Sequence, residues 1–287
     1  MVQRIAFLGP KGTFTEEALG RYIEHEGWQV ELLEAHTIDE AIELTMQDKT
    51  DYAFVPIENS LGGTVLTTMD YLTEHRHIEI CGEIVMPIRH YVWGMGNTDL
   101  SEIKNVYSHP QAIRQCKPFI MEHMKEAEIH YTGSTAEGGA LVSEAGDVSN
   151  AVIGGIALGQ TYGLTRLSDE AQENTYNLTR FVLVRHNETP VLELSEQSKG
   201  RKLSLQCELD GLRPGSLWEC LGIFAKCRIN LVKIESRPTK GRLGEYKFFF
   251  DLQIESNGEA VKDALAELET VATDIQLFGV YHTIIIE

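Results

Sequence analysis

The sequence has few basic residues and no long hydrophobic segment. Its 287 residues include 25 Lys and Arg against 43 Asp and Glu, so the formal net charge is −18. A field of that sign repels phosphates, which argues against a nucleic acid or an anionic membrane as partner. The longest strongly apolar stretch, 151–159, is too short to span a bilayer, and the N-terminus lacks a signal-peptide pattern. We therefore expect a globular, cytoplasmic protein.

Cysteine is also scarce. The five cysteines are odd in number, and no two of them have C-x-x-C spacing. This argues against a disulfide framework and against a Cys-rich zinc site. We expect reduced cysteines that pack as small hydrophobic side chains.

The sequence lacks the common motifs of nucleotide, zinc-peptidase and esterase sites. It contains no G-x-x-x-x-G-K-[ST], G-x-G-x-x-G, H-E-x-x-H or G-x-S-x-G. The candidate chemical groups that remain are hydroxyls, amides, a few carboxylates and the pair Thr179-Arg180, which opens an apolar strand. These groups predict chemistry that uses no cofactor and no metal.

A repeated pattern runs through the first 186 residues. A β-prone run ends at Ser or Thr, Glu or Gln follows three residues later, and a segment with helical periodicity begins. The pattern occurs at Thr13-x-x-Glu16, Thr37-x-x-Glu40, Ser108-x-x-Gln111 and Ser134-x-x-Glu137. In such a capping box the hydroxyl accepts a hydrogen bond from an early N–H of the helix. Four repeats predict an α/β fold in which helices cover a mostly parallel sheet.

Polar residues follow several predicted strands at their carboxyl ends. Glu58-Asn59-Ser60 follows the strand 51–57, and residues 9–15 and 108–111 hold the same position after two other strands. Ligands of open α/β sheets bind at this edge. Helix N-termini there carry unpaired N–H groups and a partial positive charge, so an acidic protein can still bind an anionic substrate.

The C-terminal part of the chain has a different pattern. Residues 186–200 are polar and have the composition of a linker. Beyond them, strand-like alternation and helical spacing succeed one another in the order β-α-β-β-α-β, which predicts a ferredoxin-like domain. The segments are 203–209, 217–225, 229–234, 246–254, 261–268 and 275–286.

An ordered set of short motifs resembles the prephenate dehydratase family. The catalytic part of that resemblance rests on residues 9–14, 56–60, 108–116, 162–164 and 177–181, which read GPKGTF, PIENS, SHPQ with QC, YGL and NLTRF. The motifs PGSL at 214–217 and ESRP at 235–238 resemble the family's ACT regulatory domain. The match covers nearly the whole chain without a segment similar to chorismate mutase, so the resemblance implies a monofunctional enzyme.

The resemblance implies a two-lobed, periplasmic-binding-protein-like catalytic domain and a ferredoxin-like βαββαβ ACT domain. The expected boundaries are 1–186 for the catalytic domain, 187–200 for the linker and 201–287 for the ACT domain. Lobe one would span about 1–77 and 165–186, and lobe two about 78–164.

The resemblance also implies an activity and its regulation. Prephenate would be converted to phenylpyruvate, water and carbon dioxide in L-phenylalanine biosynthesis, without a cofactor, by a carbon-oxygen lyase. L-Phenylalanine would inhibit the enzyme by binding to the ACT domains of a homodimer or homotetramer.

Candidate site residues carry over by motif. The resemblance makes Thr179 the candidate proton donor to the departing hydroxyl, with Arg180 as its electrostatic partner and Glu58 as a candidate acid. Hydrogen bonds to the substrate would come from Asn59, Ser108 and Gln115, and other substrate contacts from Lys11, Thr13 and Phe181. The L-phenylalanine site would include Gly215, Ser216, Leu217, Asn230, Glu235, Ser236, Arg237 and Pro238.

Several alternatives stay open at the level of sequence. An arogenate or broader cyclohexadienyl dehydratase would share these motifs and would tolerate an amino group on the substrate side chain. A non-catalytic amino-acid sensor would share the two domain types, but a sensor has no need of a proton donor such as Thr179. Ser108 and Thr13 could serve only as helix caps. Glu58 could be a structural partner of an arginine or a backbone N–H.

Overall fold

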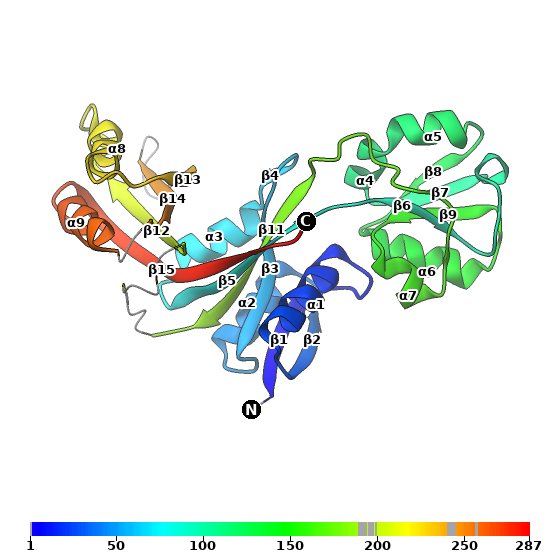
Figure 1. The fold of residues 1–287 in the computed structure, drawn as a ribbon, viewed down its shortest axis with the longest axis horizontal. Coiled ribbons are helices and arrows are strands. Elements are labelled where there is room, and N and C mark those ends of the chain that lie inside the picture. The colour runs from blue at the N-terminus through cyan, green and yellow to red at the C-terminus, as the bar shows by residue number, and fades with distance from the viewer. Residues whose placement is uncertain (1, 189–193, 195–197, 199, 240–244, 256–257) are drawn as a thin grey trace. The chain divides into compact units, whose positions relative to one another are not determined.

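The computed structural model describes residues 2–188, 194, 198, 200–239, 245–255 and 258–287 (Figure 1). The chain divides into two compact units. The first consists of residues 1–68, 84–181 and 285–287, and the second of residues 69–83 and 182–284. None of the described helices has the length and apolar character needed to cross a membrane.

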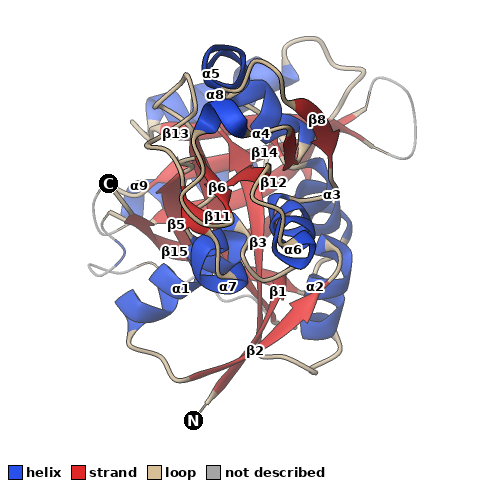
Figure 2. Ribbon diagram, turned by 90° about the vertical axis from the view of Figure 1, so that its right-hand side faces the viewer, coloured by secondary structure: helices blue, strands red, loops and turns tan. Residues whose placement is uncertain are grey.

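The first unit begins with a parallel sheet. Its strands lie in the order β3-β1-β2, and β1 is parallel to both neighbours. Because the connections from β1 to β2 and from β2 to β3 run in opposite directions across the sheet, right-handed crossovers place α1 and α2 on opposite faces (Figure 2). The elements are β1 (Gln3–Leu8), α1 (Phe14–Glu26), β2 (Val30–Ala35), α2 (Ile38–Met46), β3 (Tyr52–Asn59), β4 (Gly63–Thr64) and the start of α3 (Leu66–Glu74).

A second sheet belongs to the same unit, with the strand order β10-β6-β9-β7-β8. Helices cover both of its faces (Figure 1): Ala151 and Ile153 of β9 pack with residues of α4 and α5, whereas Val152 between them packs with residues of α6 and α7. This alternation is that of a fully buried strand. The elements are β6 (Tyr91–Gly94), η1 (Leu100–Glu102), β7 (Asn105–Ser108), α4 (Pro110–Gln115), α5 (Lys117–His123), β8 (Glu128–Tyr131), α6 (Thr135–Ala145), β9 (Asn150–Gly154), α7 (Ala157–Tyr162) and β10 (Thr165–Arg166).

The chain passes between these two sheets twice. Residues 88–90 connect β5 (Ile78–Pro87) to β6, and residues 167–177 return to β11 (Leu178–His186). Two backbone hydrogen bonds join the passages, from Ile88 N–H to the Asn177 carbonyl at 2.7 Å and from Ala171 N–H to the His90 carbonyl at 2.8 Å. His90 and Asn177 are therefore held next to each other between the sheets.

The second unit contains the predicted β-α-β-β-α-β order. Its antiparallel strands lie in the order β13-β14-β12-β15, and the core residues Cys207, Phe224, Phe250 and Ala264 join the sheet to its two helices. The predicted ferredoxin-like fold is confirmed. The elements are β12 (Lys202–Leu209), α8 (Ser216–Lys226), β13 (Leu231–Pro238), β14 (Tyr246–Gln253), α9 (Glu259–Leu268) and β15 (Ala272–Ile285).

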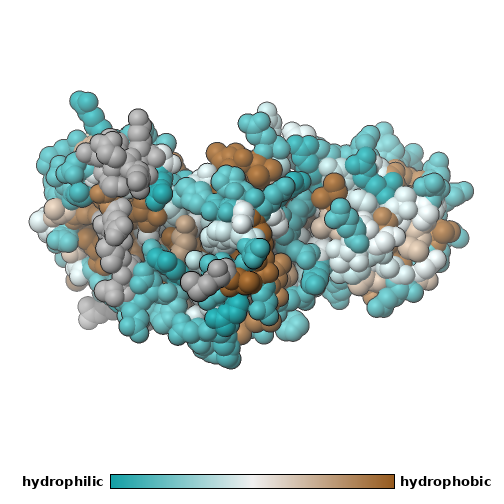
Figure 3. Space-filling view, turned by 60° about the horizontal axis from the view of Figure 1, so that its bottom comes forward, coloured by the Kyte–Doolittle hydropathy of each residue, from teal (hydrophilic) through white to brown (hydrophobic). Residues whose placement is uncertain are grey.

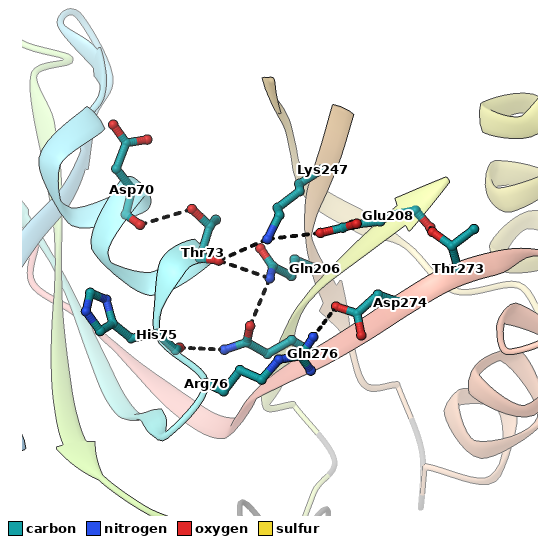
Figure 4. Close-up of polar contacts among 10 residues, drawn as sticks. All are labelled: Asp70, Thr73, His75, Arg76, Gln206, Glu208, Lys247, Thr273, Asp274 and Gln276. Carbon is teal, nitrogen blue, oxygen red and sulfur yellow. Dashed lines mark hydrogen bonds and ion pairs between the residues drawn. The ribbon is translucent and has the colours of Figure 1, made fainter. Parts of the chain in front are cut away.

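The C-terminal end of α3 contacts the sheet of the second unit through polar groups (Figure 4). Gln206 Nε2 and Lys247 Nζ each donate to the Thr73 carbonyl at 3.3 Å, and Gln276 Nε2 donates to the His75 carbonyl at 2.7 Å. The last carbonyls of a helix have no partner within it, so these donors satisfy groups that burial would otherwise leave unpaired.

Three of the four predicted helix caps are confirmed, and the one at Ser108 is wrong. The N–H groups of Glu16, Glu40 and Glu137 donate to the hydroxyls of Thr13, Thr37 and Ser134, respectively. Ser108 is the last residue of β7, and its buried hydroxyl donates to the Ile153 carbonyl of β9 at 2.6 Å. The cap of α4 is His109, whose Nδ1 accepts from Gln111 N–H at 3.2 Å. The strand includes Ser108, so its hydroxyl lies within the sheet.

Candidate active site

The first unit contains a cavity of about 770 Å³. Both sheets contribute to its wall, through the three segments that were predicted at the carboxyl ends of strands and through the two passages between the sheets. Much of the wall is apolar: Leu8, Pro10, Phe14, Pro56, Val65, Ile88, Ala112 and Phe181. Its hydroxyl, amide and imidazole groups belong to Thr13, Thr15, His36, Asn59, His90, His109, Gln111, Gln115, Ser134, Thr135, Asn177 and Thr179, and its two carboxylates to Glu34 and Glu137.

A chain of three hydrogen-bonded amide side chains lies at this wall. Asn59 Nδ2 donates to Asn177 Oδ1 at 2.8 Å, and Asn177 Nδ2 donates to Gln115 Oε1 at 2.9 Å. We call Asn59, Asn177 and Gln115 the amide chain. It connects the end of β3 to the end of α4, so two residues that the sequence predicted for substrate binding lie in one hydrogen-bonded network.

Thr179 lies beside the start of the amide chain. Asn59 Nδ2 donates to Thr179 Oγ1 at 2.8 Å, and the side chain of this threonine is largely buried. Since Thr179 accepts this hydrogen bond, its own proton is available for a group inside the cavity. An N–H donor at Oγ1 also stabilises negative charge that develops on this oxygen.

Strand alternation separates two predicted catalytic residues from the cavity. Thr179 and Phe181 of β11 line the cavity, whereas Arg180 between them does not. The guanidinium of Arg180 pairs with the carboxylate of Glu58 at 2.6 Å, and Glu58 alternates in the same way with Asn59 on β3. Side chains of consecutive strand residues point to opposite faces, so Arg180 points away from Thr179 and Phe181, and its partner Glu58 lies outside the cavity wall as well.

The other predicted substrate contacts differ in position. Thr13 lines the cavity and also caps α1, and Phe181 lines it while stacking on Phe54 with 5.7 Å between ring centroids. Ser108 is fully buried and lies outside the cavity wall. Lys11 is exposed and also lies outside the wall; its carbonyl accepts a hydrogen bond from the Tyr162 hydroxyl at 3.0 Å.

Two helix N-termini bring partial positive charge to the cavity wall. Among the described residues of the wall, none is Lys or Arg. The first residues of α1 and α6, Thr13–Thr15 and Ser134–Thr135, are wall residues, and the capping hydroxyls of both helices bind only the third N–H. The first two N–H groups of a helix have no intrahelical partner, so both termini can bind anions.

Sequence reasoning missed several polar residues of the cavity wall, among them His90, Gln111 and Asn177. Gln111 and Asn177 stand inside motifs that the resemblance rests on, so their motif position was a usable signal. His90 stands between two strands with no motif around it. Its importance is visible only in the fold, where burial lowers its pKa from 6.5 to about 4 and Nε2 lies 2.9 Å from Gln115 Oε1.

The residues predicted for the L-phenylalanine site lie on two elements of the second unit. Gly215, in the left-handed region with φ of 87°, precedes Ser216 and Leu217 at the start of α8. Asn230 and the motif Glu235–Pro238 belong to the other group, on and just before β13. Within this group Arg237 is engaged by Asp70 of α3, whose Oδ1 accepts from Nε at 2.9 Å and from Nη2 at 2.5 Å.

Known proteins share both parts of this chain. The family model for prephenate dehydratase matches residues 5–189, and the model for the ACT domain matches residues 213–270. The prephenate dehydratase of Methanocaldococcus jannaschii is 34% identical over 281 residues, which cover 98% of this chain and 98% of that protein. The prephenate dehydratase of Bacillus subtilis is 32% identical over 284 residues, with coverage of 98% and 99%.

A solved structure agrees with these matches. The crystal structure of prephenate dehydratase from Arthrobacter aurescens in complex with L-Phe has a TM-score of 0.83 and 31% identity, and the match covers 97% of this chain and 90% of that one. The predicted family and α/β fold class are confirmed. This chain belongs to the prephenate dehydratase family and carries a C-terminal ACT domain.

Proposed function

We propose that this chain converts prephenate to phenylpyruvate, water and carbon dioxide as a carbon-oxygen lyase of L-phenylalanine biosynthesis. The observation that carries the proposal is the hydrogen bond of 2.8 Å from Asn59 to Thr179 in the cavity wall of a prephenate dehydratase fold. It joins the two motifs, PIENS and NLTRF, at one point of the site.

The reaction needs orientation and one proton. The bond from ring carbon C1 to its carboxylate breaks and releases carbon dioxide, its electron pair moves through the ring, and the bond from C4 to its oxygen breaks. The departing hydroxide takes up a proton and leaves as water. Because the ring becomes aromatic, the driving force resides in the substrate. The protein has to orient a dianion and place a donor at the leaving oxygen.

Thr179 is proposed as the group at the leaving oxygen. Its hydroxyl transfers a proton to that oxygen as the bond to C4 breaks, and Asn59 stabilises the charge that develops on Oγ1. Oγ1 regains a proton from solvent water once the product water has left. Arg180 and Glu58, which pair with each other outside the cavity wall, would act on the stability of this region and would not touch the substrate.

The two carboxylates of prephenate are proposed to lie at the N-termini of α1 and α6, beside Thr13–Thr15 and Ser134–Thr135. The apolar part of the wall, with Val65, Ile88 and Phe181, would contact the ring. This arrangement explains how a chain with a net charge of −18 holds a dianion without a basic side chain in the wall.

Regulation by L-phenylalanine is proposed at the ACT domain, since the Arthrobacter aurescens enzyme was crystallised with L-Phe. The site would comprise Gly215–Leu217, Asn230 and Glu235–Pro238 in a homodimer or homotetramer. Figure 3 shows that hydrophobic side chains reach the surface at several places on one face of the molecule. In the ACT domain, the exposed hydrophobic residues support an assembly: Val232 and Ile234 of the edge strand β13 are 43% and 49% exposed, and Trp218 of α8 is 77% exposed.

The domain boundaries of the sequence analysis are proposed unchanged: 1–186 for the catalytic domain with its two lobes, 187–200 for the linker and 201–287 for the ACT domain. Residues 189–193, 195–197 and 199 of the linker lie outside the described residues.

A cytoplasmic location is proposed as well. The five cysteines are free thiols, which supports a reducing compartment: Cys81, Cys116, Cys207, Cys220 and Cys227.

The test is the formation of phenylpyruvate by the purified protein from prephenate, measured with and without L-phenylalanine, and with arogenate as a second substrate. We expect turnover of prephenate that L-phenylalanine suppresses. If only arogenate is turned over, arogenate replaces prephenate as the proposed substrate. If the folded protein turns over neither compound, the proposed enzymatic function is wrong.

A further inference from the structure

His90 lies in the cavity wall and has one ring nitrogen without a hydrogen-bond partner among the described residues. The residue is 3% exposed, and its ring meets the Phe14 ring edge to face, with 5.2 Å between centroids. Nε2 lies 2.9 Å from Gln115 Oε1, whereas Nδ1 is buried and unpaired. Buried polar atoms are nearly always paired in folded proteins, so the unpaired Nδ1 of a residue in the cavity wall is open to a hydrogen bond from a ligand in the cavity.

The amide chain fixes which nitrogen of His90 carries the proton. The N–H groups of Leu61 and Gly62 donate to Asn59 Oδ1 at 3.1 and 2.7 Å, and a backbone N–H can only donate. This sets the orientation of the Asn59 amide, whose Nδ2 must then donate to Asn177 Oδ1.

The same logic continues along the chain to the imidazole. Asn177 Nδ2 donates to Gln115 Oε1, so the atom of Gln115 that faces His90 is an oxygen. An oxygen can only accept, and His90 Nε2 must therefore carry a proton. Because burial also lowers the pKa of His90 to about 4, the imidazole is neutral at pH 7 and Nδ1 presents a lone pair.

We propose that Nδ1 of His90 accepts a hydrogen bond from the C4 hydroxyl of prephenate. The inference rests on the proposed function. At neutral pH both carboxylates of prephenate are ionised and its keto oxygen bears no hydrogen, so the C4 hydroxyl is the one O–H group of the substrate. Its pairing with Nδ1 would satisfy a buried lone pair and leave the oxygen's own lone pairs free to accept from Thr179.

The lone pair of His90 Nδ1 also disfavours a substrate carboxylate beside it, because both groups can only accept hydrogen bonds. The two carboxylates are then directed to the helix termini at Thr13–Thr15 and Ser134–Thr135, while the hydroxyl end of the ring faces His90. His90 would thus set which end of the substrate enters which part of the cavity.

Matched substitutions separate the two ring nitrogens. His90→Gln places an amide near Nε2 and keeps a donor for Gln115, whereas His90→Asn places an amide near Nδ1 and keeps an acceptor for the substrate. His90→Phe keeps the ring and removes both nitrogens. We expect His90→Gln and His90→Phe to lose about tenfold in kcat/KM for prephenate and His90→Asn to recover part of that loss. A wild-type kcat/KM in His90→Gln together with a loss in His90→Asn would overturn the proposal, because His90 would then serve only to support Gln115.

A spectroscopic measurement tests the proposal without these variants. ¹⁵N NMR of the imidazole in the wild-type protein should show a proton on Nε2 and none on Nδ1, and the opposite tautomer would overturn the proposal. Prephenate added to the slow Thr179→Val protein should move the Nδ1 resonance in the direction of hydrogen bonding, and an Nδ1 resonance that stays in place at saturation would also overturn it. If the wild-type protein does not turn over prephenate, the proposed function is wrong. The NMR measurement on the free protein still determines the tautomer of His90 in that case, so the two failures can be distinguished.

Discussion

At the scale of single residues, the direction of each hydrogen bond matters more than its presence. Two backbone N–H groups, at Leu61 and Gly62, orient the amide of Asn59. That amide in turn makes Thr179 an acceptor toward Asn59, which leaves its proton for the cavity. Groups that can only donate therefore determine the chemical role of a hydroxyl that could otherwise point either way.

The buried imidazole of His90 predicts a pH dependence of stability. Its pKa falls from 6.5 to about 4 on folding because of burial, so the unfolded chain binds the extra proton between these values. The free energy of unfolding should therefore rise as the pH goes from about 4 to 6.5 and gain nothing further from this group at higher pH. A shift of that size corresponds to about 3 kcal/mol.

The comparison of wild type with His90→Phe isolates this contribution from the other titrating groups. Chemical denaturation at several pH values between 4 and 7 should show a steeper profile for the wild type. Parallel profiles for the two proteins would contradict a buried neutral His90.

At the scale of elements, alternation along β3 and β11 sorts side chains into two sets. Asn59, Thr179 and Phe181 face the cavity, and Glu58 and Arg180 form an ion pair outside the cavity wall. The sequence predicted both strands, because their hydrophobic patterns are local. It could not assign faces to adjacent motif residues, since that requires the register of the fold.

The ion pair outside the cavity wall predicts an effect on stability without a matching effect on chemistry. Glu58→Gln removes the charge that faces the partly buried guanidinium of Arg180, and we expect a loss of about 2 kcal/mol in the free energy of unfolding. The value of kcat should stay within about threefold of wild type, which is less than the effect of removing a donor or acid at the reacting atoms. Denaturation and steady-state kinetics on the same preparation check this, and a collapse of kcat in a protein of normal stability would make Glu58 catalytic.

The end of β7 shows a second limit of local reasoning. The Ser-x-x-Gln spacing at Ser108 fits a capping box as well as the three confirmed caps do. In the fold, the Ile153 carbonyl of the neighbouring strand takes the Ser108 hydroxyl, and His109 caps the helix instead. The competing partner is distant in the sequence, so no pattern around residue 108 could reveal it. The same holds for His90, whose ring contacts Gln115 of α4 and Phe14 of α1.

At the scale of the whole molecule, the proposed function requires an acidic chain to bind an acidic substrate and to respond to an amino acid. The helix termini at the cavity would meet the first demand without basic side chains. The second demand is assigned to the ACT domain, where Gly215 starts α8 with a backbone conformation that other residues rarely adopt. Composition and motifs predicted both tasks, and the sequence also predicted helix N-termini as a source of positive potential. Which helix starts line the cavity, those of α1 and α6, required the fold.

Gly215 therefore offers a test of regulation. Gly215→Ala strains the left-handed backbone at the start of α8, by about 1 kcal/mol, and should raise the concentration of L-phenylalanine needed for half inhibition severalfold while kcat stays unchanged. Gly222→Ala in the same helix is the matched control, because a Cβ there would meet no atom within 4 Å and Gly222 has no positive φ. Equal inhibition of both variants and the wild type would remove Gly215 from the effector site.

The most direct test of the account is the kcat of two Thr179 variants on prephenate. Thr179→Ser keeps the hydroxyl beside Asn59, and Thr179→Val keeps the shape of the side chain without a proton to donate. We predict that Thr179→Ser stays within about tenfold of wild type and that Thr179→Val loses about 10²-fold or more, with both proteins unfolding at temperatures near that of the wild type. A Thr179→Val protein with the kcat of the wild type would contradict the assignment of Thr179 to the leaving oxygen.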